Sequence, residues 1–561
     1  MTELVRRARS HADALVLALL VAFSTVRYVT GLGFYSDDWA FLQLMYSSPD
    51  QSFGGLVSAL YRGDVVIQQR PVQVVFLAAL YALFDLNPLG YHLANSCVLI
   101  AMAVTFYLIL RELRVGRLLA FSIPVTYALL PHYSTDRFWV AAFQAPLSIL
   151  FYFLSLYAAL RSERSHRGSA AAWVIASAVS AAASVLAYEV TLPLLLLTPA
   201  VVGLYRYTRP DHGSRQRVCT AVPWLLTVAT AIALGAAVAF KLWVSVRVGV
   251  GVEGGLVPHA AWLATGALQL NFGTYGVGLP YLVLWIGRFS RDWPTIVLSG
   301  VCFGLIYWYV LHLVRQERSP MVHVRSSRYA TVFVIVGFVV FGLGYVIFLS
   351  SGDVWFTSTS LGNRINIAAA IGVATCFIGT IGWTINLVPC MVWRERLMAG
   401  SVAMLCGVGI LITNTLGGFW VDAYQQQERI TANVVSQLGE LPPQRILLLD
   451  GVCLERGGAY VFTGQRDLAG RLRIIYDDPS LWATAPSQPP VLEEDYLVVH
   501  TYETDVYSYD DKLVVYDYRT GRVYPLSSRE VAQQYYDTLG FNHERECPPG
   551  FAWGWGENTL R

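Results

Sequence analysis

The sequence predicts a mainly α protein: a polytopic transmembrane bundle of about 11 helices followed by a small α/β domain. The first observation is composition, because 55% of the 561 residues are hydrophobic and 14% are charged, against about a quarter charged in soluble proteins. The second is that long apolar segments recur over residues 1–420. The third is that arginine clusters follow every second segment, before residues 421–561 take the composition of a soluble domain.

The spans are assigned by the roughly 20-residue length that crosses a bilayer core. They are residues 14–26, 94–110, 118–130, 139–160, 170–187, 190–205, 222–246, 295–314, 330–349, 365–388 and 398–419. All arginine clusters fall on the side of the N-terminus, beginning with Arg6, Arg7 and Arg9. The positive-inside rule then predicts a plasma (inner) membrane protein with a cytoplasmic N-terminus and an extracytoplasmic C-terminal domain.

Two of the outer loops are long, at residues 31–90 and 247–294. The first contains an apolar run at 72–84, which is too short to cross a bilayer and is expected to form an interfacial or re-entrant helix. The second is rich in glycine and aromatic residues and is expected to hold an amphipathic helix or a hairpin within 260–289.

The C-terminal domain carries both helical and strand patterns. These predict helices at 422–441 and 528–539 and strands at 445–450, 472–476, 496–500 and 512–516. Cys453 and Cys547 lie here and belong to no metal-binding spacing. Outside the cell, Cys453 and Cys547 are a candidate disulfide pair.

Two neighbouring carboxylates, Asp37 and Asp38, follow directly on the first span. One explanation is structural, because Ser36 is a good N-cap and acids suit the first turn of a helix. The other is chemical, because a helix N-terminus keeps a carboxylate ionised, as a general base must be. The two explanations are compatible, and the topology places both acids at the outer membrane surface.

The same topology brings further polar side chains to that surface. They are Arg70, His92, His132, Asp136, Glu189, Arg247 and Arg364, with Lys241 two turns inside its span. Such a set suits group transfer from a lipid-linked phosphate, because a carboxylate can accept the proton of an acceptor hydroxyl while cations hold the departing phosphate. A net charge of +2 and the lack of a basic arm give no indication of a nucleic-acid partner.

Several short motifs follow one another in a recognisable order. They are SDDW at 36–39, QQRPV at 68–72, LFDLNPLGYHLANS at 83–96, YALLPHYSTDRFWVAAF at 127–143 and AYEVTLPLLL at 187–196, with LGNR at 361–364. This order resembles the GT-C glycosyltransferases, and more narrowly the bacterial enzymes akin to protein O-mannosyltransferases that use polyprenyl-phosphate sugars. The resemblance covers the N-terminal part of the chain well and is weak across the later spans and the C-terminal domain.

The resemblance implies an inverting sugar transfer from a polyprenyl-phosphate donor to a glycan, lipid or protein acceptor outside the cytoplasm. By position, the general base is Asp37 or Asp38, and we slightly favour Asp38, with Asp37 orienting the acceptor or a metal. Candidates for the donor phosphate are Arg70, Arg364, Lys241 and Arg247, and candidates for other substrate contacts are His132, Asp136, Glu189 and His92. Tyr188 stands where relatives carry a lysine beside the acid.

Each candidate also has a structural alternative, which stays open at this point. The alternatives are extension to lipid headgroups for Arg70 and Lys241, helix capping for Glu189, mutual pairing for His132 and Asp136, and interfacial packing for His92. Arg364 opens an expected helix, where a cation is disfavoured, so an anionic partner is expected there.

A divalent cation, Mg²⁺ or Mn²⁺, could bind Asp37 and Asp38 through oxygen, although cationic side chains can also neutralise a phosphate unaided. The competing function is a transporter or flippase for a lipid-linked glycan. Transporters often carry internal repeats and charges near the bilayer midplane, whereas this sequence shows no repeat and its charges lie at the outer edge. The sequence therefore favours an enzyme, and it names neither the sugar nor the acceptor.

Overall fold

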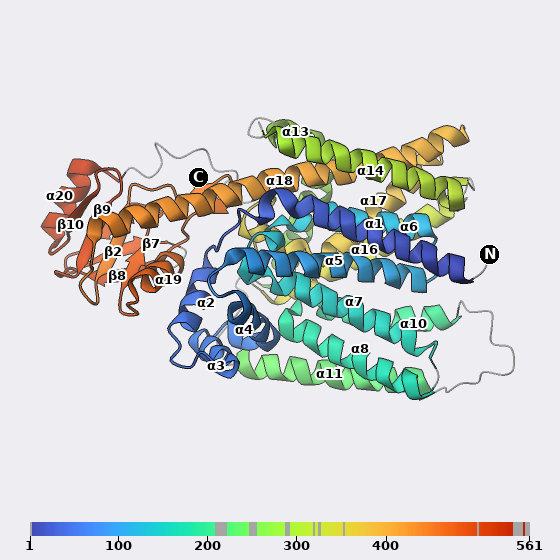
Figure 1. The fold of residues 1–561 in the computed structure, drawn as a ribbon, viewed down its shortest axis with the longest axis horizontal. Coiled ribbons are helices and arrows are strands. Elements are labelled where there is room, and N and C mark those ends of the chain that lie inside the picture. The colour runs from blue at the N-terminus through green and yellow to red at the C-terminus, as the bar shows by residue number, and fades with distance from the viewer. Residues whose placement is uncertain are drawn as a thin grey trace.

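The computed structural model describes residues 3–165, 167–207, 221–245, 255–286, 292–317, 320–323, 327–351, 354–501, 504–541 and 554–555. A helical bundle makes up most of the molecule, and a domain of strands and helices lies at one end of it (Figure 1). The N-terminus lies at the other end of the bundle (Figure 1).

The helices of the bundle are α1 (Glu3–Val29), α2 (Asp37–Tyr46), α3 (Phe53–Gly63), α4 (Pro71–Phe84), α5 (Pro88–Glu112), α6 (Arg117–Leu129), α7 (Gln144–Ser162), α8 (Arg167–Ala187), α9 (Leu192–Leu195), α10 (Thr198–Tyr207), α11 (Ala221–Ser245), α12 (Leu256–Leu268), α13 (Leu279–Ile286), α14 (Trp293–Glu317), α15 (Pro320–His323), α16 (Ser327–Val346), α17 (Ala369–Ile385) and α18 (Met391–Leu438). Short 3-10 segments are η1 (Ile67–Gln69), η2 (Pro131–Arg137), η3 (Val140–Ala142), η4 (Glu189–Thr191), η6 (Ile347–Ser350) and η7 (Leu361–Asn366), and η5 (Gln269–Val277) is a π-helix.

Within the described residues, nine helical segments are long and apolar enough to cross a membrane. They correspond to nine of the expected spans, and the two remaining expected spans are the shorter apolar helices α6 and α17. The polytopic helical architecture predicted from the sequence is therefore confirmed.

The two short helices lie in the interior and continue into irregular backbone. All residues of α6 after Arg117 are buried, and α6 leads into η2, while η7 leads into α17. Non-helical backbone at membrane depth is tolerated where protein surrounds it or where it lines a cavity. Here η2 and η7 lie side by side, and the Thr135 hydroxyl donates to the Ser360 carbonyl at 2.5 Å.

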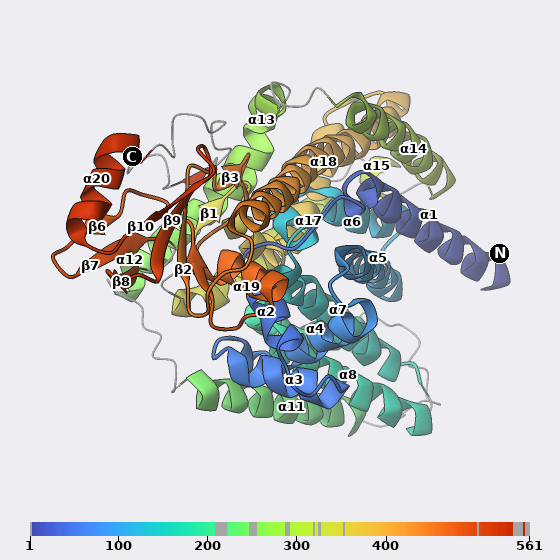
Figure 2. The same ribbon diagram turned by 60° about the vertical axis from the view of Figure 1, so that its left-hand side comes forward.

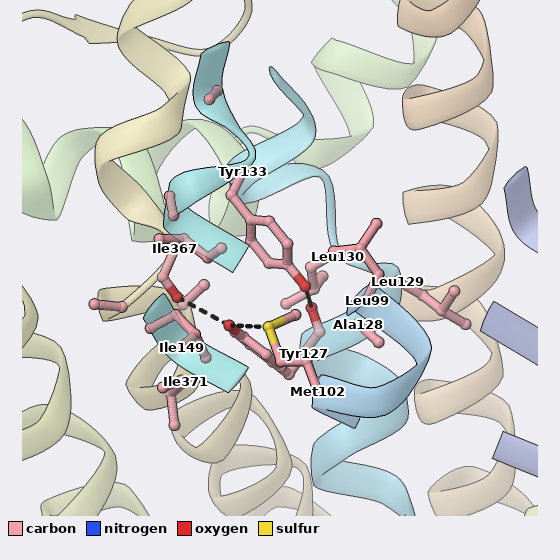
Figure 3. Close-up of a cluster of buried hydrophobic side chains, with 14 of the residues drawn as sticks. Leu99, Met102, Tyr127, Ala128, Leu129, Leu130, Tyr133, Ile149, Ile367 and Ile371 are labelled. Atoms are coloured by element: carbon pink, nitrogen blue, oxygen red, sulfur yellow. Dashed lines mark hydrogen bonds between the residues drawn. The ribbon is translucent and has the colours of Figure 1, made fainter. Parts of the chain in front are cut away.

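Buried tyrosines connect the helices beneath these segments (Figure 3). The Tyr133 hydroxyl donates to the Tyr127 carbonyl at 2.9 Å, and the Tyr127 hydroxyl lies 3.3 Å from the Ile367 carbonyl oxygen. Buried tyrosine hydroxyls usually find such partners. Leu99, Met102, Ile149 and Ile371 belong to the same apolar cluster (Figure 3).

The arginine-rich turns lie at the same end of the bundle as the N-terminal half of α1. Arg117 forms an ion pair with Asp13 of α1, and Arg161 and Arg164 both pair with Glu112. The arginine-rich turns therefore share one end of the bundle with the N-terminus, as the positive-inside rule requires. Which side of the membrane this end faces remains a prediction.

The first outer loop folds into helices at the opposite end of the bundle. The run predicted as an interfacial or re-entrant helix is α4, which packs against α3. Ser52 caps α3 by accepting from the Gly55 amide, and Asn87 caps α5 by accepting from the Leu89 amide. In the second long outer loop, the described residues form helices rather than a hairpin.

The last span and the first helix of the C-terminal domain form one element. We predicted separate helices at 398–419 and 422–441, but α18 runs through both for 48 residues, about 72 Å at 1.5 Å per residue. Residues 419–423, where the two predicted helices meet, are Phe-Trp-Val-Asp-Ala, so no proline interrupts the helix there. The expected boundary near residue 420 therefore lies inside a continuous helix that carries the domain.

The C-terminal domain contains helices α19 (Gln465–Tyr476) and α20 (Arg529–Leu539) and strands β2 (Ile446–Asp450), β3 (Glu455–Arg456), β4 (Ala459–Tyr460), β5 (Trp482–Thr484), β6 (Val491–Leu492), β7 (Tyr496–His500), β8 (Thr504–Ser508), β9 (Leu513–Asp517) and β10 (Arg522–Pro525). One sheet has the order β10-β9-β2-β5, with β2 parallel to both β9 and β5. A second, antiparallel sheet has the order β6-β7-β8. Away from them, β1 (Phe356–Thr357) pairs with β11 (Gly554–Trp555).

One predicted strand of this domain is wrong. Residues 472–476 form the end of α19, because their apolar run continues a helical spacing that begins with Leu468. In Figure 2, α19 lies beside α2 of the first outer loop, which it contacts. Cys453 is disulfide-bonded, and Cys547 lies outside the described residues, so their pairing stays a prediction.

Candidate active site

A cavity of about 150 Å³ lies where the first outer loop, the segment around η7 and the C-terminal domain meet. It is lined by Ser36, Asp37, Trp139, Trp355, Leu361, Gly362, Arg364, Ile365, Thr463, Gly464, Gln465, Arg466 and Thr501. One carboxylate, two guanidinium groups, two indoles and several hydroxyls thus surround a single space. It lies at the end of the bundle away from the N-terminus.

The two aspartates of the first outer loop have different environments. Successive residues of a helix point about 100° apart, and α2 begins at Asp37. Asp37 lines the cavity, whereas Asp38 is buried and accepts hydrogen bonds from the amides of Tyr35 (2.9 Å), Val140 (3.3 Å) and Ala141 (2.6 Å). Burial raises the pKa of Asp38, and these donors counteract part of that effect.

We slightly favoured Asp38 as the base, and the choice between the two acids stays a prediction. The Asp38 oxygens are occupied by backbone donors, and its contacts connect the first outer loop to η3. The cavity position belongs to Asp37.

Two serines beside the cavity have a left-handed backbone. Ser36 has φ +48° and Ser360 has φ +68°, a region that costs a non-glycine residue about 1–3 kcal/mol. Ser36 occupies the predicted N-cap position of α2, but its side chain forms no cap and instead lies 3.1 Å from the Thr463 hydroxyl. Such outliers persist where the surrounding structure imposes them, and they concentrate at functional sites.

Arg364 of η7 lies over an aromatic ring, and its charge acts on a buried acid. Its guanidinium lies 4.9 Å from the centroid of the Trp139 ring. Asp136 is fully buried, and no described residue donates a hydrogen bond to either of its carboxylate oxygens. Burial raises the pKa of Asp136, against the opposing attraction of Arg364 and Arg137.

The two predicted histidines are both buried, and neither is among the residues that line the cavity. His92 Nε2 lies 2.9 Å from the Gly33 carbonyl oxygen, and its ring packs edge-on against Phe143, which fits the packing alternative. His132 lies against Tyr275 of the π-helix, with ring centroids 4.5 Å apart. Burial lowers the pKa of His132 to about 3, so this side chain is neutral at pH 7.

Arg70, Glu189 and Lys241, distant in sequence, form one cluster. Arg70 Nη2 lies 3.2 Å from Glu189 Oε1, and Lys241 Nζ lies 2.7 Å from Glu189 Oε2. Arg70 also lies over the Tyr188 ring, 4.7 Å from its centroid. Two cations share one carboxylate here, so the cluster carries a net positive charge.

This cluster neighbours the cavity, because Tyr188 interacts electrostatically with both Arg70 and Arg364. Neither Arg70 nor Lys241 extends to lipid headgroups, since both bind Glu189. Arg247, the fourth predicted cation, lies outside the described residues.

The location of the C-terminal domain suggested a role in acceptor binding, but none of the residues that it contributes to the cavity was predicted. The segment Thr463–Arg466 leads into α19 and includes its first two residues, and the Asp467 carboxylate accepts from the Thr463 hydroxyl (2.9 Å) and the Gly464 amide (3.2 Å). Arg466 also forms an ion pair with Asp64 of the first outer loop at 3.2 Å. We predicted no helix start here, and no local pattern indicates a partner loop more than 400 residues earlier.

The predicted acid pair does not fit a shared divalent cation. The Asp38 oxygens accept three amide hydrogen bonds, and Asp37 is the acid of the pair that lines the cavity. Over the described ranges, no group of three or more His, Cys, Asp or Glu side chains could hold a metal ion. We therefore derive no chemical step through a metal.

No family model and no curated protein matches the chain. Among solved structures, it is similar to ArnT from Cupriavidus metallidurans bound to undecaprenyl phosphate, with 14% identity, a TM-score of 0.36 and 87% of each chain covered. It is also similar to the Archaeoglobus fulgidus oligosaccharyltransferase tethered with an acceptor peptide, with 12% identity, a TM-score of 0.36, and 84% of this chain and 63% of that chain covered. A likeness at this level assigns no activity to the chain.

Proposed function

We propose that this chain is a membrane glycosyltransferase of the GT-C type, which transfers a sugar from a polyprenyl-phosphate donor to an acceptor outside the cytoplasm. The observation that carries the proposal is the cavity at the end of the spans, where Asp37 shares one small space with Arg364. The motifs that resemble GT-C enzymes contribute both the acid and its surroundings. The bundle gives a polyprenyl chain an apolar surface beside the site.

In the proposed reaction, the Asp37 carboxylate accepts the proton of the acceptor hydroxyl as its oxygen attacks the anomeric carbon. The bond between that carbon and the phosphate oxygen breaks, and its electron pair leaves with the polyprenyl phosphate. Attack from the side opposite the phosphate inverts the anomeric configuration. Asp38 holds the loop so that Asp37 stays in the cavity.

The leaving phosphate is assigned to the cations on the membrane side of the cavity. Arg364 and the cluster of Arg70 with Lys241 would stabilise the charge that develops on it. Glu189 limits the charge of this cluster before the donor binds and keeps both cations in place. Trp355, which is exposed, offers a flat face to the sugar.

The acceptor is assigned to the wall formed by the C-terminal domain. Thr463, Gln465 and Thr501 present hydroxyl and amide groups to the cavity, and such groups recognise hydroxyls or peptide groups equally well. The acceptor class therefore remains glycan, lipid or protein.

The test measures transfer of radiolabelled sugar from a polyprenyl-phosphate donor to cell-envelope acceptors in membranes carrying Asp37→Asn. We expect transfer to fall by about 10²–10⁴-fold, the usual contribution of a general base. The matched control is Asp50→Asn, an exposed acid of the same loop whose carboxylate bonds the Ser52 amide. Unchanged transfer by a folded Asp37→Asn variant would refute the proposal, and lipid-glycan translocation without transfer would favour the flippase.

A further inference from the structure

We infer that helix α19 of the C-terminal domain positions the helix that carries Asp37, and that it does so through Gly470 and Arg471. The inference rests on the proposed function, since it gives these two residues the task of holding the proposed base in place. Helix α2 begins at Asp37, and α19 contacts it at Trp39 and Ala40, within the same helical turn (Figure 2). The C-terminal domain therefore belongs to the catalytic unit and is more than a wall for the acceptor.

The two helices meet backbone to backbone at Gly470. A Cβ atom at this position would lie 2.7 Å from the Trp39 carbonyl oxygen and 2.8 Å from its carbonyl carbon, closer than such atoms approach one another in folded proteins. The atoms that it would meet belong to the main chain, so no change of rotamer can relieve the clash. Glycine permits this close approach, and any other residue would displace α2 from α19.

Arg471 adds a side-chain contact at the same place. It is 4% exposed, and its guanidinium lies 4.6 Å from the centroid of the Trp39 ring. Its Nη1 donates to Gln427 Oε1 at 3.0 Å, and its Nη2 forms an ion pair with Glu428. Attraction between a cation and an indole is stronger when both are removed from water, and Trp39 is itself buried.

Gln427 of α18 connects the two helices through one oxygen. Its Oε1 accepts from Trp39 Nε1 at 3.1 Å as well as from Arg471. Its amide nitrogen donates to the Val461 carbonyl of the C-terminal domain at 2.7 Å. Because Gln427 is fully buried and both ends of its amide are bonded, α2, α18 and α19 are fixed to one another. A shift of α19 is therefore passed on to α2.

The same helix also contributes to the cavity. Gln465 and Arg466, the first two residues of α19, line the cavity together with Asp37. Asp38 separately connects α2 to the amides of η3. One rigid helix thus supplies part of the acceptor wall and, about one turn further on, holds the helix of the base, so α19 sets the distance between them.

The first test is Gly470→Ala in the purified full-length protein, with the donor and cell-envelope acceptors of the Asp37→Asn assay. Sugar transfer and the slower hydrolysis of the donor by water are both measured. Alanine is the better helix former, so α19 itself is not weakened, whereas its Cβ displaces α2. Because a misplacement of about 1 Å can cost about 100-fold in rate, we expect kcat for both reactions to fall by about 10–100-fold. KM for the donor should stay unchanged, since the cations assigned to its phosphate are untouched.

The matched control is Gly418→Ala on α18. Gly418 is exposed, and a Cβ atom there would meet no atom within 4 Å. The same chemical change should therefore leave kcat, KM and the unfolding midpoint of the protein near their wild-type values.

The second test compares two substitutions of Arg471. Arg471→Met keeps a long unbranched side chain without its donors, and we expect kcat to fall about tenfold. Arg471→Lys keeps a positive charge beside Glu428 but loses the planar group over Trp39, so its kcat should lie between those of Arg471→Met and the wild type. Unfolding is followed in parallel and kcat is referred to folded protein, so a loss of stability alone does not lower it.

Three results would overturn the inference. Wild-type kcat in folded Gly470→Ala and Arg471→Met would do so, and the proposed function would still stand if Asp37→Asn had lost transfer. Loss of transfer with unchanged donor hydrolysis would also do so, because the C-terminal domain would then act through the acceptor alone. Wild-type transfer by Asp37→Asn would refute the proposed function and the inference with it.

Discussion

Two fully buried aspartates at opposite ends of the bundle, Asp13 and Asp136, differ in how their carboxylates are satisfied. Asp13 accepts four hydrogen bonds, two from Arg117 (2.6 and 2.8 Å) and one each from the hydroxyls of Tyr107 (2.8 Å) and Tyr309 (2.6 Å). Asp136 accepts none from any residue that the structure describes. Two arginines, Arg364 and Arg137, act on it only through their charge.

We interpret Asp13 as a residue that stabilises the fold and Asp136 as part of a functional site. A buried charge with a full set of donors is compensated and joins α1, α5, α6 and α14 at the end with the arginine turns. A buried carboxylate without donors is costly, and the backbone near it is strained at Ser36 and Ser360. The unpaired Asp136 carboxylate and the positive φ of Ser36 and Ser360 lie at the end of the bundle where Asp37 lines the cavity, which supports placing the chemistry there.

The largest stability effect is expected at Asp13. The substitution Asp13→Ala leaves the partly buried Arg117 guanidinium without its acidic partner and removes the acceptor of two tyrosine hydroxyls. We expect the free energy of unfolding to fall by about 3–5 kcal/mol. Denaturation of the purified protein in detergent measures the change. As a control, Arg315→Ala removes an exposed arginine whose pair with Glu395 has a distance of 3.4 Å, and it should cost no more than about 1 kcal/mol.

At Asp136 we expect a small effect on stability and a larger effect on sugar transfer. The substitution Asp136→Asn removes a buried charge that has no hydrogen-bond donors, so we expect the free energy of unfolding to change by less than about 1 kcal/mol, or to rise. Sugar transfer should fall by about tenfold, because Arg364 loses a nearby negative charge that helps to fix its position. Parallel unfolding and transfer assays decide, and a loss of stability as large as that of Asp13→Ala would make Asp136 a structural residue.

The smallest effect is expected at Ser36, where glycine and alanine can be compared. Glycine adopts a positive φ without strain and alanine does not, so Ser36→Gly should be more stable than Ser36→Ala by about 1 kcal/mol. Both variants lose the contact with Thr463 and should transfer sugar more slowly than the wild type. Equal unfolding free energies for the two variants would show that the backbone at this position carries no strain.

The sequence was sufficient to predict the spans and the end of the bundle at which each polar cluster lies. Both follow from local properties. An apolar run of sufficient length partitions into the bilayer, and arginine-rich turns stay on the cytoplasmic side. The local explanation of Ser36 and Asp37 was also correct in part, since α2 begins at this point. The short spans α6 and α17 were found from their apolarity, but nothing local showed that both end inside the protein.

Contacts between distant residues were decided by the tertiary structure. A sequence pattern places Asp37 and Asp38 in one helical turn, but the packing of η3 onto that turn selects Asp38 for burial and leaves Asp37 in the cavity. The sharing of Glu189 by Arg70 and Lys241 likewise joins residues 119 and 52 positions apart.

The sequence by itself thus determined which segments enter the membrane and which polar residues emerge together, because the partition of each segment depends on its own side chains. Only the tertiary structure decided which of two adjacent acids lines the cavity and that the segment Thr463–Arg466 lines it from the other side of the chain. Those outcomes depend on the packing of surfaces far apart in the chain, which no local periodicity encodes.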